Sequence, residues 1–124
     1  MNDKPIIMVV EDEDMMSLYY VDVLKNYYEV RPVPSGESMF KVLHANRVNP
    51  DLIILDIHLT GIDGWEILSR LQKDVIYKKI PVIVVSGLSE DHRAYALNLG
   101  AKDYISKPLD HNRLLERIKV LLGG

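Results

Sequence analysis

The chain has 124 residues, of which 48% are hydrophobic and 27% charged, and its formal net charge is −3. These values are typical of one folded domain with a hydrophobic core and exclude disordered and fibrous classes. The negative charge offers no basic field for a phosphate backbone, so we expect no nucleic-acid binding by this chain. The absence of cysteine excludes disulfides and thiolate metal sites, and a cytoplasmic location is the default expectation. The apolar runs are strand-sized, and residues 1–5 lack the apolar stretch of a signal peptide, so no membrane segment is expected.

Five short runs rich in β-branched residues predict strands over residues 6–10, 28–33, 52–55, 82–85 and 104–105. Longer amphipathic stretches fill the gaps between them. The first predicted helix starts at a possible cap, Asp14, and has apolar residues at helical spacing: Met16, Tyr20, Val23, Leu24 and Tyr27. The second follows Ser35 and is stopped by Asn49 and Pro50 before the third strand.

The third predicted helix spans residues 65–73. Ser89 is a possible cap for the fourth, which ends at Gly100, a residue suited to a left-handed carboxy-terminal cap. Asp110 is a possible cap for the last helix, whose apolar stripe is Leu114, Leu115, Ile118, Leu121 and Leu122. Regular alternation of strands and helices predicts a doubly wound α/β fold, with five parallel strands and helices on both faces.

Ligands of such sheets bind beyond the carboxyl ends of the strands. The residues at or just after these ends are Glu11, Asp12, Glu13, Asp56, Ser86 and Lys107. Magnesium commonly takes one or two protein carboxylates, which Asp12 and Asp56 would supply. The alternative for residues 11–14 is an acidic run that only caps the next helix.

Asp56 directly follows a buried apolar run, and a carboxylate there can act as the nucleophile of phosphoryl transfer if cations offset the charge repulsion. Lys107 would supply one cation, although lysine is more often a solvated surface residue. The Ser86 hydroxyl would donate to a phosphoryl oxygen, and Gly87 has no side chain to obstruct approach. The alternative for Ser86 is ordinary turn chemistry.

Four short segments carry these residues in one order: Val9-Val10-Glu11-Asp12, Leu55-Asp56, Val85-Ser86-Gly87 and Lys107-Pro108. Their order and spacing resemble those of response-regulator receiver domains, and the resemblance covers essentially the whole chain. It implies a single receiver domain over residues 1–124 with the flavodoxin-like strand order 2-1-3-4-5. It also implies a switch in two-component or phosphorelay signalling, and not a dedicated enzyme.

The resemblance further implies that Asp56 accepts a phosphoryl group from a phosphohistidine of a histidine kinase or phosphotransfer protein. Magnesium, or manganese, would be surrounded by Glu11, Asp12, Asp56 and the backbone carbonyl of His58. Lys107 would pair with the phosphoryl oxygens, and its bond to Pro108 is expected to be cis.

Ser86 resembles the hydroxyl switch residue of the family, and Tyr104 resembles its aromatic partner that swings inward. Tyr104 could instead be a strand aromatic packed against a neighbour. The implied output face comprises helix four, strand five and helix five, including Tyr95 and Tyr104. It would bind a second copy of the chain or a different protein.

Three positions depart from the family pattern. Thr60 stands where proline is usual, which predicts a less rigid loop over residues 59–64. Glu11 replaces the usual first aspartate, and its longer side chain is expected to reach the metal through water. His58 occupies a position at which family members tune the access of hydrolytic water; the alternative is an exposed loop histidine without effect.

Two other functions compete with this interpretation. An aspartyl-phosphate hydrolase of the haloacid dehalogenase kind needs an acid/base Asp two residues after the nucleophile, where this chain has His58, and a cap domain that this chain has no room for. A receiver-like docking module that is never phosphorylated would not need Glu11, Asp12, Asp56, Ser86 and Lys107 together.

Overall fold

The computed structural model describes residues 4–58 and 63–123. Its strands are β1 (Ile6–Val10), β2 (Glu29–Val33), β3 (Leu52–Asp56), β4 (Val82–Ser86) and β5 (Asp103–Ser106). Its helices are α1 (Asp14–Leu24), α2 (Gly36–His44), α3 (Gly64–Lys73), α4 (Arg93–Asn98) and α5 (His111–Leu121). Single 3₁₀ turns, η1 (Tyr77–Lys79) and η2 (Glu90–His92), precede β4 and α4. No helix of these residues is long and apolar enough to cross a membrane.

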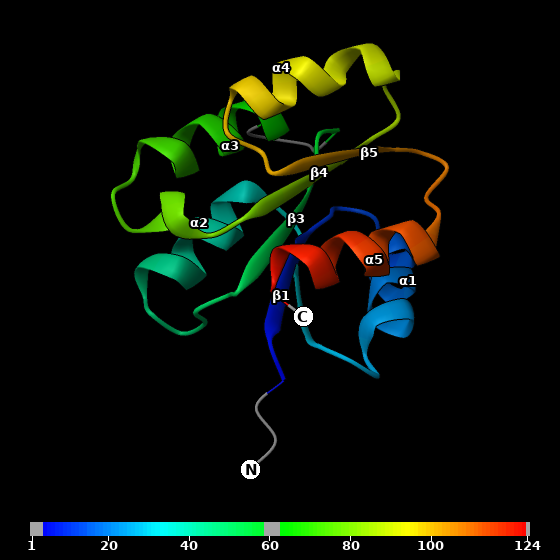
Figure 1. Cartoon of the computed structure of the whole chain (residues 1–124). Coiled ribbons are helices and arrows are strands. Elements are labelled where there is room, and N and C mark those ends of the chain that lie inside the picture. The colour runs from blue at the N-terminus through cyan, green and yellow to red at the C-terminus, as the bar shows by residue number, and fades with distance from the viewer. Residues whose placement is uncertain (1–3, 59–62, 124) are drawn as a thin grey trace.

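The five strands form one parallel sheet in the order β2-β1-β3-β4-β5, which confirms the predicted strand order. Helices α1 and α5 cover one face of the sheet, and α2, α3 and α4 cover the other (Figure 1). Strand order reverses between β1 and β3, because the chain leaves β1 for β2 on one side and returns to β3 on the other. The carboxyl ends of β1 and β3 are therefore where a ligand site is expected.

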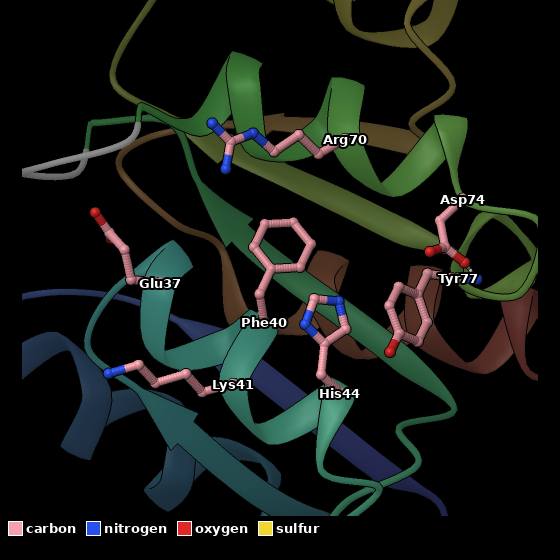
Figure 2. Close-up of a pocket in the computed structure, with 7 residues that line it drawn as sticks. All are labelled: Glu37, Phe40, Lys41, His44, Arg70, Asp74 and Tyr77. Atoms are coloured by element: carbon pink, nitrogen blue, oxygen red, sulfur yellow. Dashed lines mark hydrogen bonds between the residues drawn. The ribbon is translucent and has the colours of Figure 1, made fainter.

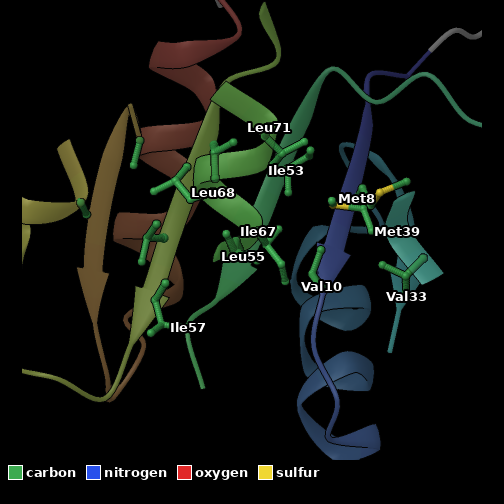
Figure 3. Close-up of a cluster of buried hydrophobic side chains, with 14 of the residues drawn as sticks. Met8, Val10, Val33, Met39, Ile53, Leu55, Ile57, Ile67, Leu68 and Leu71 are labelled. Atoms are coloured by element: carbon green, nitrogen blue, oxygen red, sulfur yellow. The ribbon is translucent and has the colours of Figure 1, made fainter. Parts of the chain in front are cut away.

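Alternating side chains of the strands fill two separate cores. Met8 and Val10 pack with α2 and α3 in the larger cluster, part of which Figure 3 shows. Ile7 and Val9 point to the opposite face and pack with α1 and α5. Burial of each such side chain stabilises the fold by about 1.5–3 kcal/mol. This period of two also fixes the direction in which the side chain at each strand end points.

The predicted cap at Asp110 is confirmed, because Asp110 accepts bonds from the first turn of α5. Ser35, which was expected only to precede the second helix, is also a cap and accepts a hydrogen bond from the backbone N–H of Ser38. The proposed cap at Asp14 is wrong, because Asp14 is already the first residue of α1 and Glu13 precedes it without a side-chain cap bond. Asp14 instead places a negative charge in the first turn, where the helix dipole favours it.

Two predicted boundaries are also wrong. Helix α2 ends at His44 and not at Asn49, since Asn46 adopts a left-handed conformation with a φ of 55°. Ser89 precedes a 3₁₀ turn and makes no side-chain cap bond. The left-handed conformation predicted for Gly100 is confirmed, with a φ of 109°. Thr60 and its neighbours 59, 61 and 62 lie outside the described residues.

Gly64 begins α3 directly against the end of β3. A Cβ atom at Gly64 would lie 2.5 Å from the Cα of Ile57 and 2.9 Å from the carbonyl oxygen of Asp56, both backbone atoms. A Cβ atom at Gly87 would meet nothing within 4 Å. The absence of a side chain at Gly64 is therefore what lets α3 begin this close to Asp56.

We expect Gly64→Ala to lower the free energy of unfolding by about 1–3 kcal/mol, because backbone atoms must shift to admit the methyl group. The matched change Gly87→Ala should alter it by no more than about 0.5 kcal/mol. Urea unfolding followed by circular dichroism measures both. Equal stabilities of the two variants would contradict the close approach of α3 to β3.

Candidate functional site

Three charged side chains meet at the carboxyl end of the sheet. Val9 pairs with Ile54 and Val10 with Leu55, so Glu11 and Asp56 come next on neighbouring strands. Ile7 and Val9 point toward α1 and α5, and by the same alternation Glu11 and Asp56 point to that side of the sheet. Both carboxyl groups are buried, with exposed fractions of only 2%.

Asp56 is held by two hydrogen bonds, one to each oxygen. The backbone N–H of His58 donates to Oδ1 at 2.8 Å, and the Lys107 ammonium donates to Oδ2 at 2.8 Å. The Lys107 side chain is 28% exposed, so its charged end reaches both solvent and the buried carboxylate. The predicted proximity of Asp56 and Lys107 is thus present, and the ion pair fixes the orientation of the carboxylate.

Only one of the two oxygens of the Glu11 carboxyl group has a hydrogen-bond partner among the described residues. Its Oε2 accepts a hydrogen bond from the backbone N–H of Glu13 at 3.2 Å, whereas its buried Oε1 has no partner within the described part of the chain. Burial, followed by the neighbouring Asp56 carboxyl, raises the pKa of Glu11 to about 8. Its ionised form therefore lacks compensating positive charge in the protein alone.

Lys107 alone does not balance the two carboxylates. Burial acts to lower the pKa of Lys107, but the hydrogen bond and the negative charges of Asp56 and Glu11 outweigh it, so the pKa is raised. One lysine thus faces two buried acidic side chains. When both carboxyl groups are ionised, one further positive charge beside Glu11 would balance them.

The donor set suits a hard divalent cation. Asp12 is partly exposed beside Glu11, and the Asp56 carboxylate and the Glu11 Oε1 offer oxygen ligands. No group of three His, Cys, Asp or Glu side chains among residues 4–58 and 63–123 forms a preformed metal cage. Magnesium needs none, since it commonly binds one or two carboxylates and keeps several waters.

Ser86 and Tyr104 lie on the other side of the sheet from Asp56. The buried Ser86 hydroxyl accepts a hydrogen bond from the backbone N–H of Leu88 at 2.9 Å. Tyr104 is fully buried, and its hydroxyl contacts the carbonyls of Leu88 and Ser89 at 3.2 and 3.0 Å. Both residues thus bind the same loop after β4. Of the two tyrosines expected on an output face, only Tyr95 is exposed, at 52%.

The strand ends are tied together beyond the ion pair. The backbone N–H of Lys107 donates to the Ser86 carbonyl at 2.6 Å, and the Lys107-Pro108 bond is cis. A Cβ atom at Gly87 would lie in open space, so the structure shows no close contact that requires glycine at this position.

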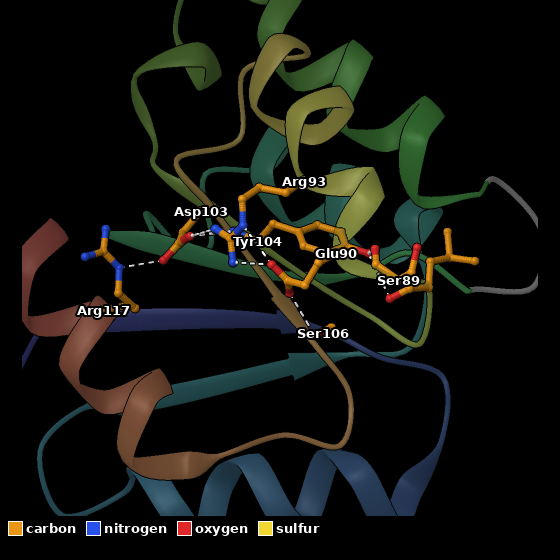
Figure 4. Close-up of polar contacts among 8 residues, drawn as sticks. Ser89, Glu90, Arg93, Asp103, Tyr104, Ser106 and Arg117 are labelled. Atoms are coloured by element: carbon orange, nitrogen blue, oxygen red, sulfur yellow. Dashed lines mark hydrogen bonds and ion pairs between the residues drawn. The ribbon is translucent and has the colours of Figure 1, made fainter.

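A charge network that the sequence analysis missed joins α4, β5 and α5 (Figure 4). Asp103 accepts hydrogen bonds from Arg93, at 2.8 Å, and from Arg117. Glu90 pairs with Arg93 and accepts a bond from the Ser106 hydroxyl at 2.8 Å. The partners are 10 and 14 residues from Asp103, outside the helical spacing that reveals ion pairs in a sequence.

Asp103 is ionised within this network. Burial acts to raise its pKa, but the Tyr104 N–H and the Arg93 and Arg117 guanidinium groups outweigh burial and hold the pKa below its usual value. The Arg93 guanidinium also lies 5.9 Å from the centre of the Tyr104 ring. The network therefore links the environment of Tyr104 to α4 and α5.

A groove of about 390 Å³ lies between α2 and α3, on the opposite face of the sheet from the one toward which Glu11 and Asp56 point (Figure 2). Phe40, His44 and Tyr77 stack along it, with ring centres 6.0 and 5.7 Å apart. Phe40 and Tyr77 also pack on the larger core. None of the predicted site residues lines this groove.

Comparison with known proteins places this chain in a family. Residues 7–119 match the family described as response regulator receiver domain. The response regulator PleD of Caulobacter vibrioides is 32% identical over 117 residues, which cover 93% of this chain and 25% of PleD. The transcriptional regulatory protein AfsQ1 of Streptomyces coelicolor is 32% identical over 120 residues, covering 95% of this chain and 51% of AfsQ1. The chain spans between 8% and 51% of the length of the curated relatives it matches.

Solved structures share the fold over nearly the whole chain. The signal receiver domain of a signal transduction histidine kinase from Syntrophus aciditrophicus has a TM-score of 0.86 at 30% identity, covering 97% of this chain and 91% of that one. The receiver domain of the Francisella response regulator 1452 has a TM-score of 0.86 at 26% identity, covering 96% of this chain and 97% of that one. The chain therefore belongs to the response-regulator receiver domains of two-component signalling.

Proposed function

We propose that Asp56 is the phosphoacceptor of this receiver domain and that its phosphorylation is magnesium-dependent. The observation that carries the proposal is the pair of buried carboxylates, Asp56 and Glu11, opposed by a single lysine. Buried charges in proteins are paired or bind metals, and the raised pKa of Glu11 means that ionising this second carboxyl group calls for a further cation. The Asp56 carboxylate is also held in a fixed orientation, as a nucleophile requires.

In the proposed reaction an Asp56 carboxylate oxygen attacks the phosphorus of a phosphohistidine. An O–P bond forms, the P–N bond of the donor breaks, and the imidazole leaves with the bonding electron pair. The charge on the transferring group is the main obstacle to this step. Lys107 would offset part of that charge at the phosphoryl oxygens, and the His58 N–H would keep the carboxylate oriented.

A magnesium ion, or manganese, would be held by Glu11, Asp12, Asp56 and the His58 carbonyl, with Glu11 acting directly or through water. When bound, it supplies the positive charge that Lys107 alone does not provide. His58 has an exposed side chain next to the nucleophile, where it would tune the access of hydrolytic water.

The switch would run from Ser86 through Tyr104 to α4. A phosphoryl group on Asp56 would accept a hydrogen bond from the Ser86 hydroxyl and draw Ser86 toward Asp56, away from the Leu88 N–H that donates to it now; Leu88 lies in the loop that Tyr104 also binds. Phosphorylation adds roughly 1.5 to 2 negative charges, enough to redistribute arrangements that differ in these contacts. The proposed output face is α4, β5 and α5, with the exposed Tyr95 on α4.

The partners follow from this chemistry. Receiver domains take phosphoryl groups from histidine kinases and regulate downstream effectors. For this chain we propose a histidine kinase or a phosphotransfer protein as donor, and a downstream protein or a second copy as the partner of the output face. The chain itself would act as a switch and not as a dedicated enzyme.

The first prediction concerns the phosphoacceptor. Incubation with magnesium and a small acyl phosphate should add one phosphoryl mass to the intact protein, measured by mass spectrometry. Asp56→Asn should abolish the gain, and so should removal of magnesium with a chelator. Asp22→Asn is the matched control, since Asp22 is an exposed surface carboxylate of α1 and should leave the gain unchanged. A gain that survives Asp56→Asn would refute the assignment.

The second prediction concerns Lys107. Lys107→Met keeps much of the side-chain length and removes the charge, so the initial rate of phosphorylation should fall by roughly 10²-fold, as when a donor to a developing anion is lost. The matched control is Lys102→Met, since Lys102 is exposed and precedes the amino end of β5, whereas Lys107 follows the carboxyl end of the same strand. Equal rates for the wild type and Lys107→Met would rule out this role.

The third prediction uses Trp65, the single tryptophan of the chain. Its ring lies 4.8 Å, centre to centre, from that of Tyr95 on α4, in a T-shaped contact. If phosphorylation moves α4, the emission of Trp65 should change when beryllofluoride or an acyl phosphate is added with magnesium. Tyr95→Leu should remove most of the change, and Asp56→Asn all of it. An unchanged spectrum in fully phosphorylated protein would argue against α4 as the moving element.

A further inference from the structure

The hydroxyl of Tyr20 in α1 is a buried polar group to which neither the fold nor the proposed function has given a role. Tyr20 is 1% exposed, and its hydroxyl has no hydrogen-bond partner within residues 4–58 and 63–123. A buried tyrosine hydroxyl usually has a partner, and leaving it without one is unfavourable. A leucine or phenylalanine would fill the core here without that cost.

The place of Tyr20 in the fold directs its hydroxyl toward the acidic site. Long side chains of an α-helix lean toward the amino terminus of the helix, and α1 begins at Asp14, three residues after Glu11. Helix α1 lies on the sheet face toward which Glu11 and Asp56 point (Figure 1). The Tyr20 ring belongs to the same core cluster as Val9 and Ile54.

Val9 and Ile54 are paired in the sheet, and each precedes its site carboxylate by two residues. Tyr20 therefore shares a core cluster with the two side chains that come before Glu11 and Asp56 on the same face of the sheet. Burial, and then the negative charges of these two residues, raise the pKa of the Tyr20 hydroxyl well above its usual value. At neutral pH the hydroxyl keeps its proton and remains a hydrogen-bond donor.

Two unpartnered buried groups of complementary chemistry thus lie at the same end of the sheet: the Tyr20 hydroxyl, a donor, and the Glu11 Oε1, an acceptor. They are not hydrogen-bonded to each other. A buried water molecule commonly bridges groups of this kind and satisfies both.

We propose that Tyr20 is a positioning residue of the acidic site, whose hydroxyl donates a hydrogen bond to a water molecule that the Glu11 carboxylate also binds. This contact would hold Glu11 in the orientation that a divalent cation requires. The inference rests on the proposed magnesium-dependent function. It assigns a role to a tyrosine that its helical spacing identifies only as a core residue.

The experiment is Tyr20→Phe, which removes one oxygen atom and keeps the ring. Manganese binding is measured by electron paramagnetic resonance of the free ion, a readout independent of phosphorylation. We expect the dissociation constant to rise roughly three- to tenfold, as for the loss of one hydrogen bond. Tyr19→Phe is the matched control, because Tyr19 is the adjacent, partly exposed tyrosine. The manganese affinity of this variant should stay at the wild-type value.

Two further measurements separate positioning from packing. The metal-free Tyr20→Phe protein should unfold at a urea concentration close to that of the wild type, since the ring and its packing are kept and none of the described residues bonds the hydroxyl. In a Glu11→Gln background, Tyr20→Phe should change manganese affinity by less than twofold, because groups acting through one contact are not additive.

The proposal is overturned if Tyr20→Phe binds manganese as tightly as the wild type, or if it weakens binding by the same factor in the Glu11→Gln background. If the wild type binds no manganese and gains no phosphoryl mass, the proposed function fails and this inference fails with it. If the wild type does both and only the Tyr20 effect is missing, this inference alone fails.

Discussion

The ion pair between Lys107 and Asp56 joins the ends of β5 and β3 across the intervening strand β4. The backbone N–H of Lys107 also binds the Ser86 carbonyl at the end of β4. Lys107 therefore links the carboxyl ends of three neighbouring strands, β3, β4 and β5, where the acidic side chains lie. Without its ammonium group, Asp56 and Glu11 would be buried together without the cation that now binds Asp56, a costly arrangement. The chemistry of the site and the closure of this sheet edge depend on the same contact.

The two faces of the sheet divide the proposed tasks. Glu11 and Asp56 point toward α1 and α5, whereas Ser86 and Tyr104 lie on the face covered by α2, α3 and α4. A strand presents alternate side chains to opposite faces, so neighbouring positions on one strand serve different faces. In the proposed switch, a phosphoryl group on Asp56 would accept a hydrogen bond from the Ser86 hydroxyl, which lies on the opposite face of the sheet. The signal would cross the sheet at its edge and not through its core.

The network around Asp103 would give that proposed signal a route outward. Arg93 of α4 and Arg117 of α5 both bind the Asp103 carboxylate of β5, so the three elements are held by one buried charge. Arg93 also lies over the ring of Tyr104. Breaking one of these buried ion pairs would be strongly destabilising. We therefore expect α4, β5 and α5 to move between discrete packings that keep the pairs, and not by separating from one another. A change at Tyr104 would thus reach both helices of the proposed output face.

The amino-acid sequence alone determined the elements, their order and the acidic cluster, because hydrophobic periodicity is local and parallel strands bring their ends to one edge. It placed Asp56 and Lys107 together on that basis. Helix ends were less certain, and Asp14 and the end of α2 were misjudged because capping depends on side-chain contacts that spacing does not show. Only the tertiary structure decided which oxygen of Glu11 lacks a partner, that the Tyr20 hydroxyl is buried on the same side of the sheet, and that Asp103 binds two arginines. These contacts join side chains from separate elements, and packing in three dimensions sets them.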